Sequence, residues 1–251
     1  MSQSNYTIQR LVIIMAMEDE ARLIINSLQM KPFHSDFVDE IPMQFYQCQT
    51  KSLEITLVVS GKDERYQVDN IGTEAACLAT YVAIKNFKPD LIISAGTAGG
   101  FGKKGAEIGT VYLSKKHFVY HDRHVPLPDF CESAIGYYPA LDISKMAKDL
   151  NLPMGVISTG SSLKKNADDI VMIEKNNAVA KEMEVAAIAW VAMLLKTPLV
   201  AVKSITNILD EENLSEEAFI ANLTFACQSL HDKVLVIIDY LQEKSLADLA
   251  L

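Results

Sequence analysis

The chain has 251 residues, 49% of them hydrophobic and 22% charged, with a formal net charge of −9 at pH 7 and a pI of about 5.1. This length and apolar content suit one α/β domain with a sizeable core, so we expect a single domain over residues 1–251, of which 1–9 form a flexible N-terminus. The acidic balance argues against nucleic-acid partners and anionic membrane surfaces, because both are bound through clustered Lys and Arg.

Strand-like and helix-like patterns alternate along the chain. A nearly all-apolar run at 11–17 predicts a strand covered on both faces, and the helical period over 18–28 completes a β-then-α unit. The other predicted elements are, in chain order, a strand pair at 43–50 and 52–60, a helix at 70–87 ended by "KPD", a strand at 91–96, a glycine-rich loop at 96–109, a strand at 110–121, an irregular segment at 121–140, a strand at 154–160, a helix at 184–196, a strand at 198–206 that runs into a polar turn, and a helix at 215–244. This order predicts an α/β fold.

The cysteines and the N-terminus indicate the compartment. Cys48, Cys77, Cys131 and Cys227 lie far apart and lack the paired spacing of a zinc site or a disulfide framework. The first residues show no basic start, apolar stretch and cleavage site of a secretory signal, and no apolar run approaches the roughly 20 residues that a membrane helix needs. We therefore expect reduced cysteines, no membrane partner and a cytoplasmic protein.

Polar residues gather where the predicted strands end. Ligands bind at the carboxyl ends of strands in open α/β sheets, so the segments "AMEDE", "SAGTAGG", "ISTGSS" and "SITN" can converge on one pocket. The "GTAGG" stretch would give a ligand close access to the backbone, but its spacing is not that of a dinucleotide fingerprint and no helix follows at once. A tight structural turn and a ligand cradle both remain open for it.

Two groups of acids have both a structural and a chemical interpretation. The three acids at 18–20 begin a helix, where the macrodipole favours anions, and one of them is a candidate general base. Glu182 and Glu184 flank Met183 before an apolar helix. They are either helix-start acids or a group that holds sugar hydroxyls while the methionine covers the ring.

The histidines do not predict a metal site. His117, His121 and His124 have an irregular spacing and no accompanying thiolate, so we expect loop histidines, no metal and no cofactor. The order and spacing of a Ser-His-Asp enzyme or a nucleophile elbow are also absent from the sequence.

Six segments together carry a family resemblance. In chain order they are "IIMAMEDEA", "SAGTAGGF", "HDR" followed by "VP", "STG" followed by "SL", "EMEVAAIAWVA" and "VKSITNILD". With them the chain, over residues 10–242, resembles the nucleosidase branch of the purine nucleoside phosphorylase-like family, and in particular the plant type of 5′-methylthioadenosine/S-adenosylhomocysteine nucleosidases.

The resemblance implies a fold, a reaction and an assembly. The fold is a three-layer α/β/α sandwich with a central mixed, partly barrel-like sheet. The reaction is hydrolysis of the N-glycosidic bond of a 5′-modified purine nucleoside, which is the small-molecule partner, without a cofactor. The assembly is a homodimer in which the partner chain closes the 5′ end of the ligand site.

The resemblance also implies site residues. Glu20 matches the family glutamate that activates the attacking water. The substrate-binding positions are Thr97, Ala98 and Gly99 beside the sugar and base, Leu163 against the base face, the backbone of Lys164 at the base edge, and Met183 with Glu184, which cover the ribose and bind its 2′ and 3′ hydroxyls.

Two positions depart from the family pattern. Ser161 stands where family members have Asp, and Asn207 stands where they have the catalytic Asp that donates a proton to the leaving purine. An amide can donate a hydrogen bond to purine N7 but cannot release a proton there. Loss of general acid help should weaken cleavage of an adenine nucleoside by about 10²-fold. Asp210 does not replace it, because it matches the family's own second acid.

The amide at 207 leaves three functions open. The first is the hydrolysis of 5′-modified adenine nucleosides. The second is the cleavage of 6-oxopurine nucleosides, because their O6 and N7 are adjacent acceptors and the family's trimeric phosphorylases carry a similar "TN". Water is the favoured acceptor, since Ser94 stands at the phosphate-binding strand end and the chain has only four arginines. The third is a catalytically weak member that binds purine nucleosides as a sensor.

Overall fold

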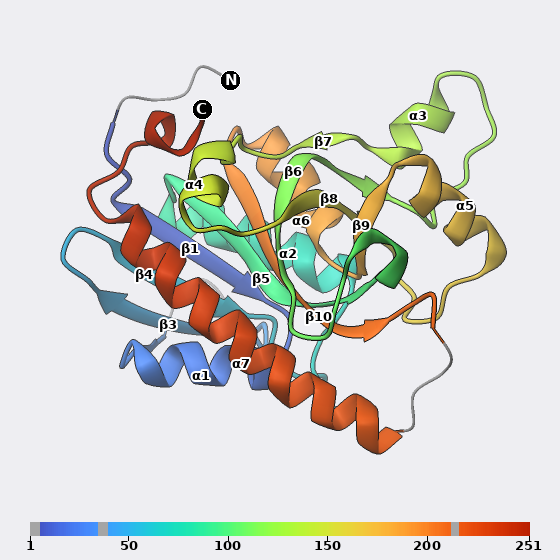
Figure 1. Ribbon diagram of the computed structural model, residues 1–251. Helices are drawn as coiled ribbons and strands as arrows, with labels where there is room; N and C mark the ends of the chain where they lie inside the picture. The colour runs from blue at the N-terminus through green and yellow to red at the C-terminus, as the bar shows by residue number, and fades with distance from the viewer. Residues whose placement is uncertain (1–5, 35–39, 212–215) are drawn as a thin grey trace.

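The computed structural model describes residues 6–34, 40–211 and 216–251, in which helices flank a large mixed sheet (Figure 1). The strands are β1 (Arg10–Met15), β2 (Lys31–Phe33), β3 (Gln44–Gln49), β4 (Glu54–Val59), β5 (Leu91–Gly100), β6 (Val111–Tyr120), β7 (Tyr138–Pro139), β8 (Met154–Thr159), β9 (Ala178–Glu182) and β10 (Leu199–Ile208). The helices are α1 (Glu18–Ser27), α2 (Thr73–Phe87), α3 (Phe130–Ile135), α4 (Ser144–Asp149), α5 (Ala167–Lys175), α6 (Val185–Leu194) and α7 (Glu216–Leu241), with 3₁₀ turns η1 (Gly102–Lys104) and η2 (Leu246–Leu249).

The sheet is partly closed on itself. Its strands follow the order β10-β6-β8-β9-β5-β1-β4-β3-β2, and β10 also pairs with β5. The strands from β10 to β5 therefore form a barrel, and β1, β4, β3 and β2 extend from it as an open sheet. Parallel pairs such as β1–β5 and β5–β10 occur together with antiparallel ones such as β5–β9 and β6–β10. The predicted mixed, partly barrel-like sheet is confirmed.

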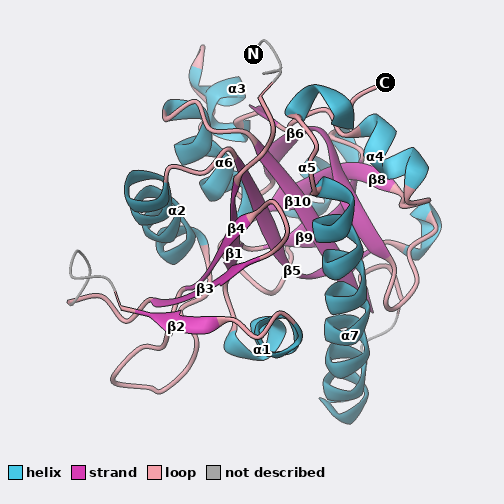
Figure 2. Cartoon of the chain, turned by 90° about the vertical axis from the view of Figure 1, so that its left-hand side faces the viewer, coloured by secondary structure: helices cyan, strands magenta, loops and turns pink. Residues whose placement is uncertain are grey.

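Both faces of β1 are covered, which explains its apolar sequence. Leu11, Ile13 and Met15 pack into a core cluster with residues of α1 and α7, whereas Val12 and Ile14 pack into a second cluster with α2 and α6. Figure 2 shows the sheet between these two helical layers, with α2 and α7 on opposite sides. A strand buried on both faces has no polar side, so its residues do not alternate between apolar and polar.

Two strands are longer than the sequence predicts, and both changes affect the pocket. β5 continues through the glycine-rich stretch to Gly100, so the tight-turn interpretation of "GTAGG" is wrong. β10 continues to Ile208, which places Asn207 in a strand rather than in a turn. The backbone pairing with β9 and β10 holds the glycines extended. A Cβ on Gly99 would lie 2.9 Å from the Leu209 side chain, so a larger residue here would force Leu209 to shift.

Several short elements escaped the sequence patterns. α3 and β7 lie within the segment predicted as irregular, and α4, α5 and β9 were not predicted at all. α5 has a recognisable signal, a capping box in which Asn166 and Asp169 bond each other's backbone N–H. The short β9, by contrast, has no alternating pattern because four of its five residues are buried.

The two predicted chain-end features fall partly on residues without a description. Of the N-terminal segment 1–9, expected to be flexible, residues 1–5 lie outside the described residues. Ile8 is fully buried, and its N–H donates to the Lys244 oxygen at 2.8 Å, so this part of the segment packs on the domain. Of the helix predicted at 215–244, Ser215 also lies outside the described ranges.

Candidate active site

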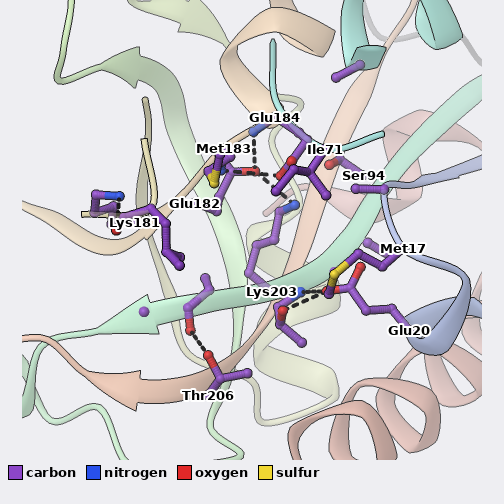
Figure 3. A pocket seen from close by; sticks show the side chains of 18 of the residues that line it. Met17, Glu20, Ile71, Ser94, Lys181, Glu182, Met183, Glu184, Lys203 and Thr206 are labelled. Carbon is purple, nitrogen blue, oxygen red and sulfur yellow. Dashed lines mark hydrogen bonds and ion pairs between the residues drawn. The ribbon is translucent and has the colours of Figure 1, made fainter. Parts of the chain in front are cut away.

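A cavity of about 300 Å³ lies at the C-terminal ends of the parallel strands β1, β5 and β10 (Figure 3). Three of the four predicted strand-end segments line it directly, and Leu163 follows the fourth. The residues predicted from the sequence that line it are Glu20, Thr97, Ala98, Gly99, Leu163, Met183, Glu184 and Asn207. Lys164, whose backbone was expected at the base edge, is exposed and is not among the residues that line the cavity.

Glu20 points in a different direction from its two acidic neighbours in the sequence. Glu18 and Asp19 lie on the outside of α1 and form ion pairs with Arg22. Glu20 is only 3% exposed and faces the cavity, where its Oε1 accepts hydrogen bonds from the Thr97 N–H at 2.7 Å and the Thr97 hydroxyl at 2.6 Å. Burial raises the pKa of Glu20 despite these bonds. The candidate base is therefore Glu20, which lines the cavity and is held by Thr97 through Oε1.

Glu182 and Glu184 have different tasks. Glu182 accepts hydrogen bonds from the Val185 N–H at 2.9 Å and the Thr159 hydroxyl at 2.5 Å, so it is the acid that starts α6. Glu184 makes no cap bond; its Oε1 accepts from the Gly72 N–H at 2.8 Å, and it lines the cavity. Burial and the charge of Glu182 raise the pKa of Glu184 to about 7.

Lys203 is the centre of this acidic group. It rises from β10 and is 2% exposed, and its Nζ lies 3.0 Å from Glu182 Oε2. Figure 3 shows Lys203 reaching toward Glu182, with Glu184 beside the pair. Burial alone would lower the pKa of Lys203, but the charges of Glu182, Glu184 and Glu20 raise it. The ammonium is thus kept charged by three buried carboxylates.

Asn207 faces the same cavity from β10. Its register partner on β5 is Gly99, directly after a bulge at Thr206. The Thr206 hydroxyl lies 3.0 Å from Asn207 Oδ1 and donates to it. The side-chain amide nitrogen of Asn207 is therefore the group that can donate to a ligand. Asp210 is already engaged, since its two oxygens accept from the N–H groups of Gly102 and Lys103. It is a loop anchor and not a replacement acid.

The cavity residues that the sequence patterns did not assign to the site include Lys203, Lys181 and Ser94. Lys203 had a signal, because a lysine inside the apolar run "PLVAVKSIT" needs a buried counter-charge. Ser94 was noted only as the missing phosphate ligand. Its Oγ is buried and has no hydrogen-bond partner in the part of the chain that the structure describes, so it is available to a ligand in the cavity.

The histidines do not form a metal centre. His121 is 1% exposed, its Nδ1 lies 3.0 Å from the Ser158 Oγ, and burial lowers its pKa to about 4. It is a core histidine rather than the loop histidine that we expected. Within residues 6–34, 40–211 and 216–251 there is no group of three or more His, Cys, Asp or Glu side chains that could hold a metal ion.

Comparisons with known proteins agree with this geometry. The family model described as "Phosphorylase superfamily" matches residues 10–238. Two Arabidopsis thaliana proteins, a 5′-methylthioadenosine nucleosidase and a 5′-methylthioadenosine/S-adenosylhomocysteine nucleosidase, are each 37% identical over 243 residues, which cover 96% of this chain and 91% and 95% of theirs. The solved apo structure of the Arabidopsis 5′-methylthioadenosine nucleosidase superposes with a TM-score of 0.94 at 36% identity, over 97% of this chain and all of that one.

The buried ion pair generates a stability prediction. Lys203→Met should lower the free energy of unfolding by about 3–5 kcal/mol, because it leaves the Glu182 carboxylate buried without its counter-charge. The double variant Glu182→Gln/Lys203→Met should recover part of that loss. Urea unfolding measures both, with Arg22→Met, at an exposed ion pair, as the control that costs at most about 1 kcal/mol. A Lys203→Met loss no larger than the control's would contradict the account.

Proposed function

The chain belongs to the phosphorylase superfamily, and we propose that it hydrolyses the N-glycosidic bond of a 5′-modified purine nucleoside to the free base and a ribose derivative. The observation that carries the proposal is the group of three glutamates around Lys203 at one end of a cavity large enough for a nucleoside. The names of the relatives in Arabidopsis indicate the substrate type, a 5′-methylthioadenosine or S-adenosylhomocysteine.

The acidic group suits the chemistry of the sugar. As the bond from C1′ to the purine breaks, the sugar acquires oxocarbenium character and therefore positive charge. Carboxylates in a buried site stabilise that charge more strongly than they would in water. Glu20 lines the cavity and is not the acid that Lys203 pairs with, so it is the candidate base. It takes a proton from the water that attacks C1′, while the electron pair of the broken bond leaves with the purine.

The ribose is held by Glu184 and Met183. An ionised carboxylate can accept hydrogen bonds from both the 2′ and the 3′ hydroxyl, and Glu184 is fixed for this by the Gly72 N–H. Met183 lines the cavity next to it and can cover the ring face. The raised pKa of Glu184 means that sugar binding should compete with protonation near neutral pH.

Water is favoured over phosphate as the acceptor. Phosphate would bring negative charge next to Glu20, Glu182 and Glu184, and the nearest compensating charge, Lys203, is already paired with Glu182. The strand-end residue Ser94 lines the cavity, and its uncharged hydroxyl can hold water but cannot neutralise a phosphate. The site therefore supports hydrolysis.

The base remains the point where two candidates compete. Leu163 and the strand residues Thr97 to Gly99 form apolar and backbone surface that suits any purine. With Oδ1 bonded to Thr206, Asn207 offers N–H donors to N7 of adenine or to N7 and O6 of a 6-oxopurine. The amide is the observation that favours a 6-oxopurine nucleoside as the second candidate. A protein that binds such nucleosides without turning them over is the remaining alternative.

A homodimer and a cytoplasmic location complete the proposal. Apolar side chains of α2 and α6, among them Tyr81 and Trp190 at 51% and 43% exposure, line a hollow of about 550 Å³. α2 begins at Thr73, beside the Gly72 that holds Glu184, so a partner seated on this surface would adjoin the sugar end of the cavity. The compartment rests on the unpaired cysteines. No helix in the described residues is long and apolar enough to cross a membrane.

Glu20→Gln tests the general base. The glutamine oxygen can still accept from Thr97, so nucleoside binding should survive while turnover falls by about 10²-fold or more. Steady-state kinetics and calorimetry measure the two effects separately. Asp19→Asn, which removes an exposed acid one residue away, is the control that should keep wild-type turnover. Normal turnover in Glu20→Gln would remove Glu20 from the mechanism.

The pH dependence of substrate binding tests Glu184. Because its folded pKa is raised to about 7, the carboxylate gains a proton as the pH falls through that value and loses a charged acceptor for the ribose hydroxyls. Ribonucleoside affinity should therefore be highest above pH 7 and decline below it. Glu184→Gln should bind weakly without this pH dependence. A wild-type affinity that stays constant from about pH 5 to about pH 8 would exclude the role of Glu184.

Asn207→Asp distinguishes the two bases. The carboxyl group can donate a proton to the leaving adenine, so hydrolysis of adenine nucleosides should rise by about 10- to 10³-fold. Activity on inosine-type nucleosides should fall, because an ionised carboxylate would face O6 without a proton to share. The assay uses adenosine- and inosine-type 5′-modified nucleosides with and without phosphate, and separates ribose from ribose 1-phosphate.

The outcomes of this assay decide between the candidates. A gain on adenine nucleosides with no inosine activity in either form favours a nucleosidase weakened by Asn207, whereas a clear loss on inosine-type nucleosides favours a 6-oxopurine enzyme. Wild-type protein that binds nucleosides but releases no base from any of them is a binding protein. No effect on either substrate in a folded Asn207→Asp variant would show that Asn207 does not contact the purine.

Trp190→Asp tests the proposed dimer surface. A charge in the middle of the apolar hollow should dissociate the homodimer and lower substrate affinity, as measured by sedimentation and by KM. Ile220→Asp, at an apolar residue of α7 that is 56% exposed, is the matched control and should leave the dimer intact. A monomeric wild-type protein would contradict this part of the proposal.

A further inference from the structure

Residues 160–166, which we name the base loop, connect β8 to α5 and carry Leu163 over the cavity. The two ends of the loop are tied to the domain. At its start the Gly160 N–H donates to the backbone carbonyl of Glu182 at 3.1 Å, and the Ser161 N–H donates to Asp122 Oδ2 at 2.6 Å. At its end Asn166 forms the capping box of α5.

The middle of the base loop depends on a lysine from another strand. Lys181 of β9 donates from its Nζ to the Ser162 oxygen at 2.6 Å and to the Leu163 oxygen at 3.2 Å. Among the described residues, these are the only hydrogen bonds that residues 162–164 make with the rest of the protein. Without them residues 162–164, whose side chains are exposed, would have no polar attachment between the Ser161 N–H and the Lys165 ammonium, which donates to the Leu209 carbonyl.

The burial of Lys181 indicates that specific neighbours hold its ammonium group. The residue is 5% exposed on a strand whose neighbours Ala178 and Ala180 are core residues. Desolvation of an ammonium is costly, and burial lowers the pKa of Lys181. The charges of Asp169, Glu182 and Asp122 raise the pKa of Lys181 and so favour its charged form. Asp169 Oδ1 is itself buried and without a hydrogen-bond partner in the described part of the chain.

Lys181 also lies at the base end of the cavity. Gly99 on β5 has two register partners, Lys181 on β9 and Asn207 on β10. The strand that carries the leaving-group amide and the strand that carries the lysine therefore flank the same glycine, and both residues line the cavity. A ligand between Leu163 and Asn207 would lie against the loop carbonyls that Lys181 holds.

We propose that Lys181 is the positioning residue for the purine base: its ammonium clamps the Ser162 and Leu163 carbonyls and so fixes the base loop in its binding conformation. The proposal rests on the proposed function, because it assigns the base end of the same site. Lys181 does not act on the sugar. Its loss should weaken base binding, since part of the binding energy would then be spent on ordering the loop.

The test compares Lys181→Met, Lys181→Arg and Lys104→Met. Lys104 donates to the Ala178 oxygen at 2.8 Å outside the cavity, so its variant removes the same kind of ammonium–carbonyl bond without touching the base loop. Calorimetry with free adenine and free hypoxanthine measures base affinity without requiring turnover. We expect Lys181→Met to weaken the base that the wild type binds by about tenfold or more, Lys181→Arg to restore most of it, and Lys104→Met to leave it unchanged.

Kinetics and hydrogen exchange separate positioning from a merely structural role. Lys181→Met should raise KM far more than it lowers kcat, and amide exchange at 162–164 should become faster while the rest of the sheet keeps its protection. Wild-type base affinity in Lys181→Met, or an equal loss in Lys104→Met, would overturn the proposal. Should Lys181→Met not fold, Lys181→Gln, which keeps an uncharged N–H donor on a shorter side chain, must show an intermediate affinity. A wild type that binds neither base overturns the proposed function instead.

Discussion

The site depends on one buried ammonium group among three buried carboxylates. Lys203 pairs with Glu182 at 3.0 Å and lies close enough to Glu184 and Glu20 for their charges to raise its pKa. One positive charge cannot neutralise three ionised carboxylates, so the group has a negative bias, and the charges of Glu182 and Glu20 add to the burial that raises the pKa of Glu184. The pKa of Glu20 is raised by burial. A cationic sugar would relieve that bias, whereas a phosphate would increase it.

The closure of the sheet brings this group together. Glu20 comes from the start of α1, Glu182 from the end of β9, Glu184 from the N-cap of α6, and Lys203 from β10. These segments meet because β5 pairs with β1, β9 and β10 at once, and its glycines leave the space over the strand to the neighbouring side chains. The two helical layers bury β1 and β5 from both sides.

Local patterns predicted the strands and helices that have a clear period, and the motif order predicted the fold and most of the cavity lining. They failed where partners far along the chain decide the structure. Gly99 and Gly100 are extended only because two other strands pair with them, and β9 is too short to show a period. Lys181 was invisible as a clamp because the carbonyls it binds are backbone atoms, which leave no trace in residue identity. The effect of Asn207, in contrast, could be predicted from the sequence, since an amide stands where the family resemblance places a proton-donating Asp.

The central claim is that the cavity is built for a positively charged sugar, and ligand affinity tests it most directly. The measurement compares two purine nucleoside analogues with the same base and 5′ group, one with a neutral ribose and one with a protonated pyrrolidine ring in its place. We expect the cationic analogue to bind about 10²-fold more tightly or better, because it resembles the oxocarbenium-like state that the carboxylates stabilise. Equal or weaker binding of the cationic analogue would contradict the account.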